Sequence, residues 1–147
     1  MNNILVVCVG NICRSPVAEV MLKKAFPEKT ILSAGLSALV GQPADKTAIE
    51  IASEHGLNLS NHRAQQINSY LCSQTELILV METDHKQALE HMYPFTRGRV
   101  HCLGHISSDE LFEISDPYQK NRQAFEESHR AIEKGVAHWV NLIRKLS

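Results

Sequence analysis

The chain has 147 residues, 44% of them hydrophobic and 21% charged, and its formal net charge is −1. This length and composition exclude an intrinsically disordered chain and predict one globular domain over residues 1–147. The near-zero charge excludes a general attraction to nucleic acid or anionic membranes, and no apolar run is long enough to span a bilayer.

The predicted elements alternate between strands and helices. Short apolar runs predict buried strands, and apolar residues at helical spacing predict helices. In chain order we expect a strand at 4–7, a helix at 16–26, a strand at 30–33, a helix at 45–55, a strand at 77–81, a helix at 83–92, a strand at 100–103 and a final helix reaching 146. This alternation predicts a flavodoxin-like α/β fold, in which helices flank both faces of a four-stranded parallel sheet.

The segment Cys8-Val9-Gly10-Asn11-Ile12-Cys13-Arg14-Ser15 joins the first strand to the first helix. It lies at the carboxyl end of a strand, where open α/β sheets bind ligands. Gly10 permits a tight turn, and Asn11 tolerates left-handed backbone geometry. Successive amides before a helix N-terminus can bind an anion, so we expect a phosphate-binding loop.

The chemistry of such a loop needs both Cys8 and Arg14. Loop amides, the helix dipole and a nearby cation favour the thiolate form of a cysteine, which is the nucleophilic form. Arg14 stays charged, and its planar guanidinium matches two phosphate oxygens. Ser15 can donate a hydrogen bond to the sulfur. The alternative is that Cys8 is only a buried strand-end residue and Arg14 a surface charge. A nucleotide-binding loop of the Walker type is excluded, because its sequence motif is missing.

The remaining cysteines carry weaker predictions. The N-terminal residues do not resemble a signal peptide, so we expect a cytoplasmic protein with free thiols. Cys72 and Cys102 are predicted core residues, whereas Cys13 either forms a protective disulfide with Cys8 or is a small residue that fits the loop. No metal or organic cofactor is expected, because neither the cysteines nor the histidines at 85, 91, 101 and 105 have metal-ligand spacing.

Across nearly its whole length the sequence resembles the low-molecular-weight protein tyrosine phosphatases. The resemblance is closest to the bacterial branch that acts on tyrosine autokinases controlling capsule and exopolysaccharide export. The matching segments are 8–16, 33–35, 38–41, 59–66 and 116–118. The family fold, a four-stranded parallel sheet flanked by helices, agrees with the predicted elements. The resemblance implies hydrolysis of phosphotyrosine through a phosphocysteine intermediate on Cys8.

The same resemblance implies roles for residues outside the loop. Asp116 would be the general acid, then the general base that activates water, although local sequence alone favours a turn-forming Asp-Pro. Ser33 and His62 would join Asn11 and Ser15 in a hydrogen-bonded network that holds the loop. An ordinary half-buried histidine is the alternative for His62.

Substrate contacts are expected from Leu39 and Tyr118, which would form the walls of the cleft. Leu39 stands where some relatives carry an aromatic residue, and Gln119 replaces a second tyrosine found in others. Tyr118 could instead be a packing residue. The implied partner is a phosphotyrosine protein, specifically a tyrosine autokinase, and a monomer is the expected state.

Two other classes of function remain open at this point. An arsenate reductase can share the fold and the loop, but it needs further cysteines close together, and Cys72 and Cys102 are far apart in the sequence. A non-catalytic phosphotyrosine-binding module would need no intact catalytic set, yet Cys8, Arg14 and Asp116 are all present. A phosphocarrier protein is a more remote third alternative.

Overall fold

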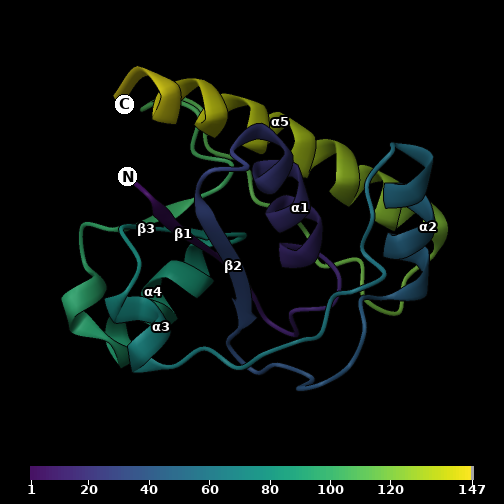
Figure 1. Ribbon diagram of the computed structural model, residues 1–147, viewed down its shortest axis with the longest axis horizontal. Coiled ribbons are helices and arrows are strands. Elements are labelled where there is room, and N and C mark those ends of the chain that lie inside the picture. Colours follow the sequence, from purple (N-terminus) through teal and green to yellow (C-terminus); the bar gives the residue numbers. More distant parts are fainter. Residues whose placement is uncertain (147) are drawn as a thin grey trace.

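The sheet has four parallel strands in the order β2-β1-β3-β4 (Figure 1). The computed structural model describes residues 1–146; the last residue of the predicted domain, Ser147, lies outside the described residues. The elements are β1 Asn3–Cys8, α1 Ser15–Ala25, β2 Thr30–Gly35, α2 Lys46–Glu54, α3 Ser69–Ser73, β3 Leu77–Val80, α4 Thr83–Met92, the 3-10 helix η1 Pro94–Thr96, β4 Val100–Cys102 and α5 Arg122–Leu146.

The predicted α/β fold is confirmed, and each of the eight predicted elements is present. Bounds differ by a few residues, most clearly in β2, which continues to Gly35 instead of ending at Ser33. Two further elements, α3 and η1, were not predicted from the sequence; they have only five and three residues. Elements this short complete too few turns to show a helical period.

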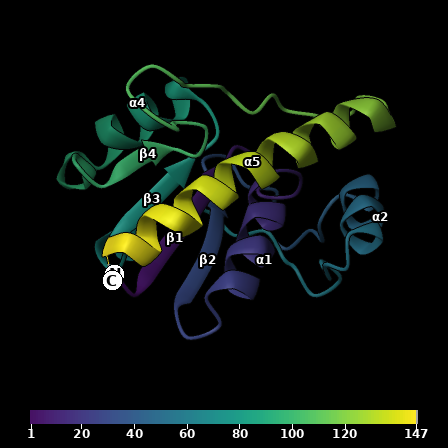
Figure 2. The ribbon, with the colours of Figure 1, turned by 90° about the horizontal axis from the view of Figure 1, so that it is seen from above.

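The two faces of the sheet pack against different helices. Residues of β1 alternate, so that Ile4, Val6 and Cys8 face one cluster while Leu5 and Val7 face the other. The first cluster contains apolar residues of α1, α2 and α5, and the second contains residues of α3 and α4. Figure 2 shows α5 running along the face that α1 also covers. Burial on both faces explains the continuous apolar character of β1.

Helix α2 has a defined start and end. Its N-cap is Asp45, whose carboxylate accepts a hydrogen bond of 2.8 Å from the amide of Thr47. After His55 at the C-cap, Gly56 has a φ of 77°, a left-handed conformation that glycine adopts without steric cost. Gly56 therefore lets the chain turn away directly after the C-cap of this helix.

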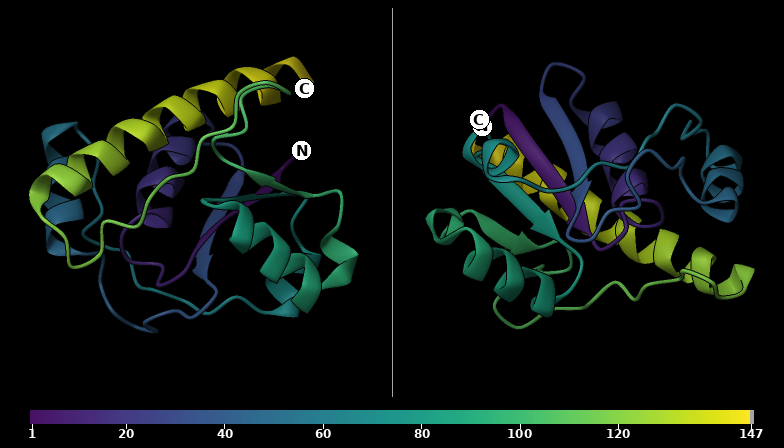
Figure 3. Two further views of the ribbon diagram at one scale, coloured as in Figure 1. Left: turned by 180° about the vertical axis from the view of Figure 1, so that it is seen from behind. Right: turned by 90° about the horizontal axis from the view of Figure 1, so that it is seen from below.

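The long connection between β4 and α5 returns to the carboxyl end of the sheet (Figure 3). The amide of Ile114 donates to the carbonyl of Met81, directly after β3, at 3.0 Å. The Glu113 carboxylate accepts from the amide of Thr83 at 2.7 Å. These two bonds hold the connection beside the end of β1, where Cys8 lies. Within residues 1–146, no helix has the length and apolar character needed to cross a membrane.

Candidate active site

The loop from Cys8 to Ser15 turns its carbonyl groups toward the segment that follows β2. The amides of residues 36, 37 and 39 donate to the carbonyls of residues 8, 9 and 10 over 2.9 to 3.1 Å, and the amide of Asp45 donates to the carbonyl of Ile12 at 2.9 Å. Asn11 has a φ of 60°, the left-handed geometry expected from the sequence. With the carbonyls held in this way, the loop can present its amides to an anion at the start of α1.

Ser15 is in direct contact with the predicted nucleophile. Its Oγ lies 2.9 Å from Cys8 Sγ and accepts a hydrogen bond of 2.7 Å from Asn11 Nδ2. Because the amide nitrogen of Asn11 can only donate, the hydroxyl hydrogen of Ser15 is free to point at the sulfur. All three side chains are buried. This geometry allows the serine hydroxyl to donate a hydrogen bond to the sulfur.

Asn11 is the centre of a larger polar network. Its Nδ2 also donates to Ser33 Oγ at 2.9 Å, and its Oδ1 accepts from the amide of Gln65 at 2.9 Å. Its carbonyl lies 2.6 Å from His62 Nε2, which carries the hydrogen because a carbonyl can only accept. The four residues expected to support the loop thus lie in one hydrogen-bonded network, and Gln65 is an addition to it.

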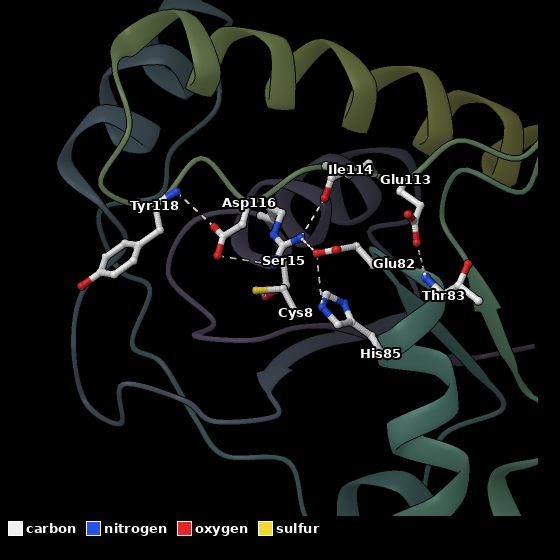
Figure 4. Close-up of polar contacts among 10 residues, drawn as sticks. Cys8, Ser15, Glu82, Thr83, His85, Glu113, Ile114, Asp116 and Tyr118 are labelled. Carbon is white, nitrogen blue, oxygen red and sulfur yellow. Dashed lines mark hydrogen bonds and ion pairs between the residues drawn. The ribbon is translucent and has the colours of Figure 1, made fainter.

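Arg14 is almost completely buried, at 1% exposure, and is held by two acceptors. Its Nη1 donates to Glu82 Oε2 at 2.6 Å and to the carbonyl of Ile114 at 2.7 Å; Figure 4 labels these two acceptors. Its Nε has no hydrogen-bond partner among residues 1–146. The edge formed by Nε and Nη2 therefore remains available for two oxygens of a phosphate.

His85 extends the contacts of Arg14 on the side of Glu82. His85 Nε2 lies 3.4 Å from the same Glu82 oxygen that binds Arg14. Burial, with the charge of Arg14 as a second cause, lowers the pKa of His85 below its usual value. The imidazole therefore stays neutral at physiological pH, and Glu82 is the negative group that faces the buried guanidinium.

Asp116 lies over the site on the connection before α5. Its Oδ2 is 3.8 Å from Arg14 Nη2, and its Oδ1 accepts a hydrogen bond of 3.1 Å from the amide of Tyr118. The second contact is the Asp-Pro turn that local sequence favoured, and the first brings the carboxylate close to the guanidinium of Arg14. The two interpretations are therefore compatible, because one oxygen serves the turn while the other faces the cavity.

These groups surround a cavity of about 160 Å³. Its lining residues are Cys8, Val9, Gly10, Ile12, Cys13, Arg14, Ser37, Leu39, Asp116 and Tyr118. Leu39 and Tyr118 are each about two-fifths exposed, so they stand at the mouth, whereas Cys8 and Arg14 are buried at the base. A planar apolar group could enter between the mouth residues with a phosphate group below it.

All four cysteines are free and buried, as expected for Cys72 and Cys102. Burial raises the pKa of the Cys13 thiol well above its usual range, and it raises the pKa of Cys72 to about 11. Burial likewise raises the pKa of Cys102. These three thiols are therefore protonated at neutral pH. Cys13 lines the same cavity as Cys8, without a bond between the two sulfurs.

Four residues around the site were not predicted from the sequence, namely Glu82, His85, Gln65 and Glu19; Glu19 accepts a hydrogen bond from Ser33 Oγ. A signal for Glu82 was present, since it closely follows the third buried strand. The carboxyl ends of parallel strands meet at one edge of the sheet, so a polar residue there belongs near Cys8. Gln65 had no comparable local signal, since it reaches the network from a distant segment: its backbone amide donates to Asn11 Oδ1 and its side-chain amide donates to the carbonyl of Ser33, each at 2.9 Å.

The comparisons with known proteins agree with this geometry. Residues 3–147 match the family model described as low molecular weight phosphotyrosine protein phosphatase. The chain is 49% identical to the low molecular weight protein-tyrosine-phosphatase Wzb of Salmonella typhimurium, over 97% of this chain and 94% of that protein. It is 46% identical to the probable low molecular weight protein-tyrosine-phosphatase EpsP of Ralstonia nicotianae, over 99% of both.

A solved structure extends the similarity to three dimensions. Vibrio vulnificus Wzb in complex with benzylphosphonate superposes with a TM-score of 0.90 at 44% identity, over 95% of this chain and 97% of that one. The fold, the geometry of the loop and the similarity over the full length all indicate the same family. This chain belongs to the low molecular weight phosphotyrosine protein phosphatases and is, within that family, a protein-tyrosine phosphatase of the Wzb and EpsP group.

Proposed function

We propose that this enzyme hydrolyses phosphotyrosine in proteins through a phosphocysteine intermediate on Cys8. The observation that supports this most directly is the convergence of three groups on one small cavity. Cys8 Sγ lies at its base beside Ser15 Oγ, Arg14 is buried with one edge of its guanidinium available, and Asp116 lies 3.8 Å from that guanidinium. A nucleophile, an electrostatic clamp and a proton donor are what phosphoryl transfer requires.

In the first step the thiolate of Cys8 attacks phosphorus. The sulfur–phosphorus bond forms as the bond from phosphorus to the phenolic oxygen breaks, and the electron pair of the broken bond goes to that oxygen. Asp116, in its acid form, gives its proton to the leaving oxygen. Arg14 and the loop amides hold the non-bridging phosphate oxygens and stabilise their charge in the transition state.

In the second step water attacks the phosphocysteine. Asp116, now a carboxylate, takes a proton from the water as the new oxygen–phosphorus bond forms. The sulfur–phosphorus bond breaks, and its electron pair returns to Cys8, where the hydroxyl of Ser15 donates to the developing thiolate. Inorganic phosphate leaves, and Asp116 is again the acid required for the next turnover.

The shape of the cavity supports a preference for tyrosine. Leu39 and Tyr118 stand at its mouth and can contact both sides of a phenyl ring, while the phosphate reaches the base. A phosphoserine side chain is shorter, so its phosphate would stop above Cys8. We also propose that the physiological substrate is a bacterial tyrosine autokinase controlling exopolysaccharide or capsule production, in the cytoplasm, because the sequence most resembles that branch.

Hydrolysis of p-nitrophenyl phosphate, with EDTA present, tests the mechanism. We expect activity from the wild type, none from Cys8→Ser and a loss of about 10²- to 10⁴-fold for Asp116→Ala, as is usual for removal of a general acid. Acid-quenched wild-type enzyme should carry phosphate on Cys8. Activity that survives in Cys8→Ser would disprove the mechanism.

The substrate needs a separate measurement. Phosphorylated autokinase should be a better substrate, by kcat/KM, than unrelated phosphotyrosine peptides, and equal values would reject the autokinase assignment alone. Arsenate reduction is not favoured: Cys72 and Cys102 lie in the apolar cluster on the other face of the sheet from Cys8, and burial raises the pKa of both thiols. They are poorly placed to take a disulfide from the active site.

A further inference from the structure

A second cluster of ionisable side chains lies between α2 and α5, outside the phosphatase site. It consists of His55 at the C-cap of α2, with His129 and Glu133 one turn apart on α5. Figure 1 shows the two helices side by side, and they are in contact. An open hollow of about 420 Å³ reaches the cluster, with His55 and Glu133 in its lining. None of these residues takes part in the proposed chemistry.

His129 is the unusual member of the cluster. The residue is almost completely buried, at 3% exposure, yet neither ring nitrogen has a hydrogen-bond partner among residues 1–146. Buried polar atoms are almost always paired, so an unpaired imidazole needs an explanation. Its Nε2 faces the Glu133 carboxylate at 4.0 Å, and its ring stacks on His55 with 4.3 Å between centroids. The unsatisfied side chain therefore lies against two other potential metal ligands.

We propose that His55, His129 and Glu133 bind a divalent transition-metal ion of the zinc type and join α2 to α5. The three ligand atoms lie within 4.8 Å of one another. In a tetrahedral zinc site, bonds of about 2.0–2.1 Å place ligand atoms about 3.3 Å apart, so a modest contraction suffices. Two imidazoles and one carboxylate form a known zinc set, with water as the fourth ligand.

Exposed side chains can bring the three ligand atoms closer together. The two imidazole planes are 27° apart, so their lone pairs do not converge while the rings are stacked. His55 and Glu133 are each about half exposed, which leaves both free to rotate toward a metal beside the fixed ring of His129.

A metal ion bound here would fix the C-terminal end of α2 to α5. The amide of Asp45, at the N-cap of α2, donates to the carbonyl of Ile12 in the phosphate loop. Fixing the far end of α2 to α5 would therefore stabilise the segment that supports the loop. The sequence-based expectation of no metal considered other histidines, and His55 and His129 are too far apart in the chain for any spacing motif to connect them.

Calorimetric titration with Zn²⁺ tests the site, and the Cys8→Ser protein is the starting point because it removes the active-site thiolate that would compete for zinc. His55→Ala and Glu133→Gln change side chains that are each about half exposed, so we expect both variants to fold. His91→Ala, at an exposed histidine at the end of α4, is the matched control. Cobalt(II) absorption reports the ligand type independently, and the melting temperature with and without zinc reports the effect on folding.

We expect one equivalent of zinc to bind, with affinity at least tenfold weaker in His55→Ala and Glu133→Gln and unchanged in His91→Ala. Zinc should raise the melting temperature of the control variant more than that of the two ligand variants. The proposal is overturned if zinc does not bind, if all variants bind it equally, or if bound cobalt shows thiolate-to-metal charge transfer. Phosphatase activity plays no part in the result, so failure here leaves the proposed function untouched.

Discussion

Replacing Ser15 by alanine tests the geometry around Cys8, the proposed nucleophile. Ser15 Oγ lies 2.9 Å from Cys8 Sγ, and Asn11 Nδ2 donates to the same oxygen at 2.7 Å. That second bond orients the serine hydroxyl so that its hydrogen points to the sulfur. Alanine removes this donor and little volume, and Asn11 Nδ2 keeps its bond to Ser33. The loop should therefore retain its shape while the sulfur loses its hydrogen bond.

The size of the effect follows from the charge on sulfur. Hydrogen bonds to charged groups contribute about 1.5–3 kcal/mol, so a transition state in which the thiolate leaves phosphorus should lose about 10- to 150-fold in rate. The loss falls chiefly on hydrolysis of the phosphocysteine, because sulfur is the leaving group in that step. Phosphocysteine should then accumulate during turnover, and kcat should fall more than kcat/KM.

Rapid-quench kinetics with p-nitrophenyl phosphate separate the two steps. We expect a burst of nitrophenol in Ser15→Ala, followed by a slow steady state. Ser37→Ala is the matched control. Ser37 lines the same cavity, but within residues 1–146 no hydrogen bond joins its hydroxyl to Cys8. A kcat for Ser15→Ala within twofold of the wild type or of Ser37→Ala, in a folded protein, would refute the orientation of this hydrogen bond.

Three further predictions concern stability. Glu82→Ala leaves the buried charge of Arg14 without its close carboxylate. Because Glu82 is about one-third exposed, we expect the free energy of unfolding, measured with urea, to fall by about 2 kcal/mol, between the values for buried and exposed ion pairs. An unchanged free energy of unfolding would contradict a stabilising role for this ion pair. Gly35→Ala would place a methyl group 2.4 Å from the Val9 carbonyl oxygen, so thermal unfolding should show a free energy of unfolding lower by about 3 kcal/mol. A variant as stable as the wild type would contradict this close approach. Folding lowers the pKa of His85 from 6.5, so just below that pH the unfolded state binds more protons, and the free energy of unfolding should fall as pH decreases through 6.5. Urea titrations at several pH values should show that stability depends less on pH in His85→Asn than in the wild type. An equal pH dependence of stability in the two proteins would exclude this contribution.

The secondary structure and the phosphate loop were predictable because their signals are local. Strand-helix alternation gave the α/β fold, and a cysteine and an arginine in a glycine-containing loop after a buried strand indicated phosphate chemistry. The left-handed conformation of Asn11 was also expected from its side chain. By contrast, α3 escaped prediction because one turn of helix shows no period.

The sequence by itself determined the fold class, the position of Cys8 at a strand end, and the residue types that the chemistry needs. Only the tertiary structure decided that Glu82 holds Arg14 and that the connection before α5 brings Asp116 to the cavity. It also decided that His55 meets His129 and Glu133. The physical reason is that local periodicity specifies each element and the face it buries, whereas contacts between distant segments depend on how whole elements pack and how long loops close.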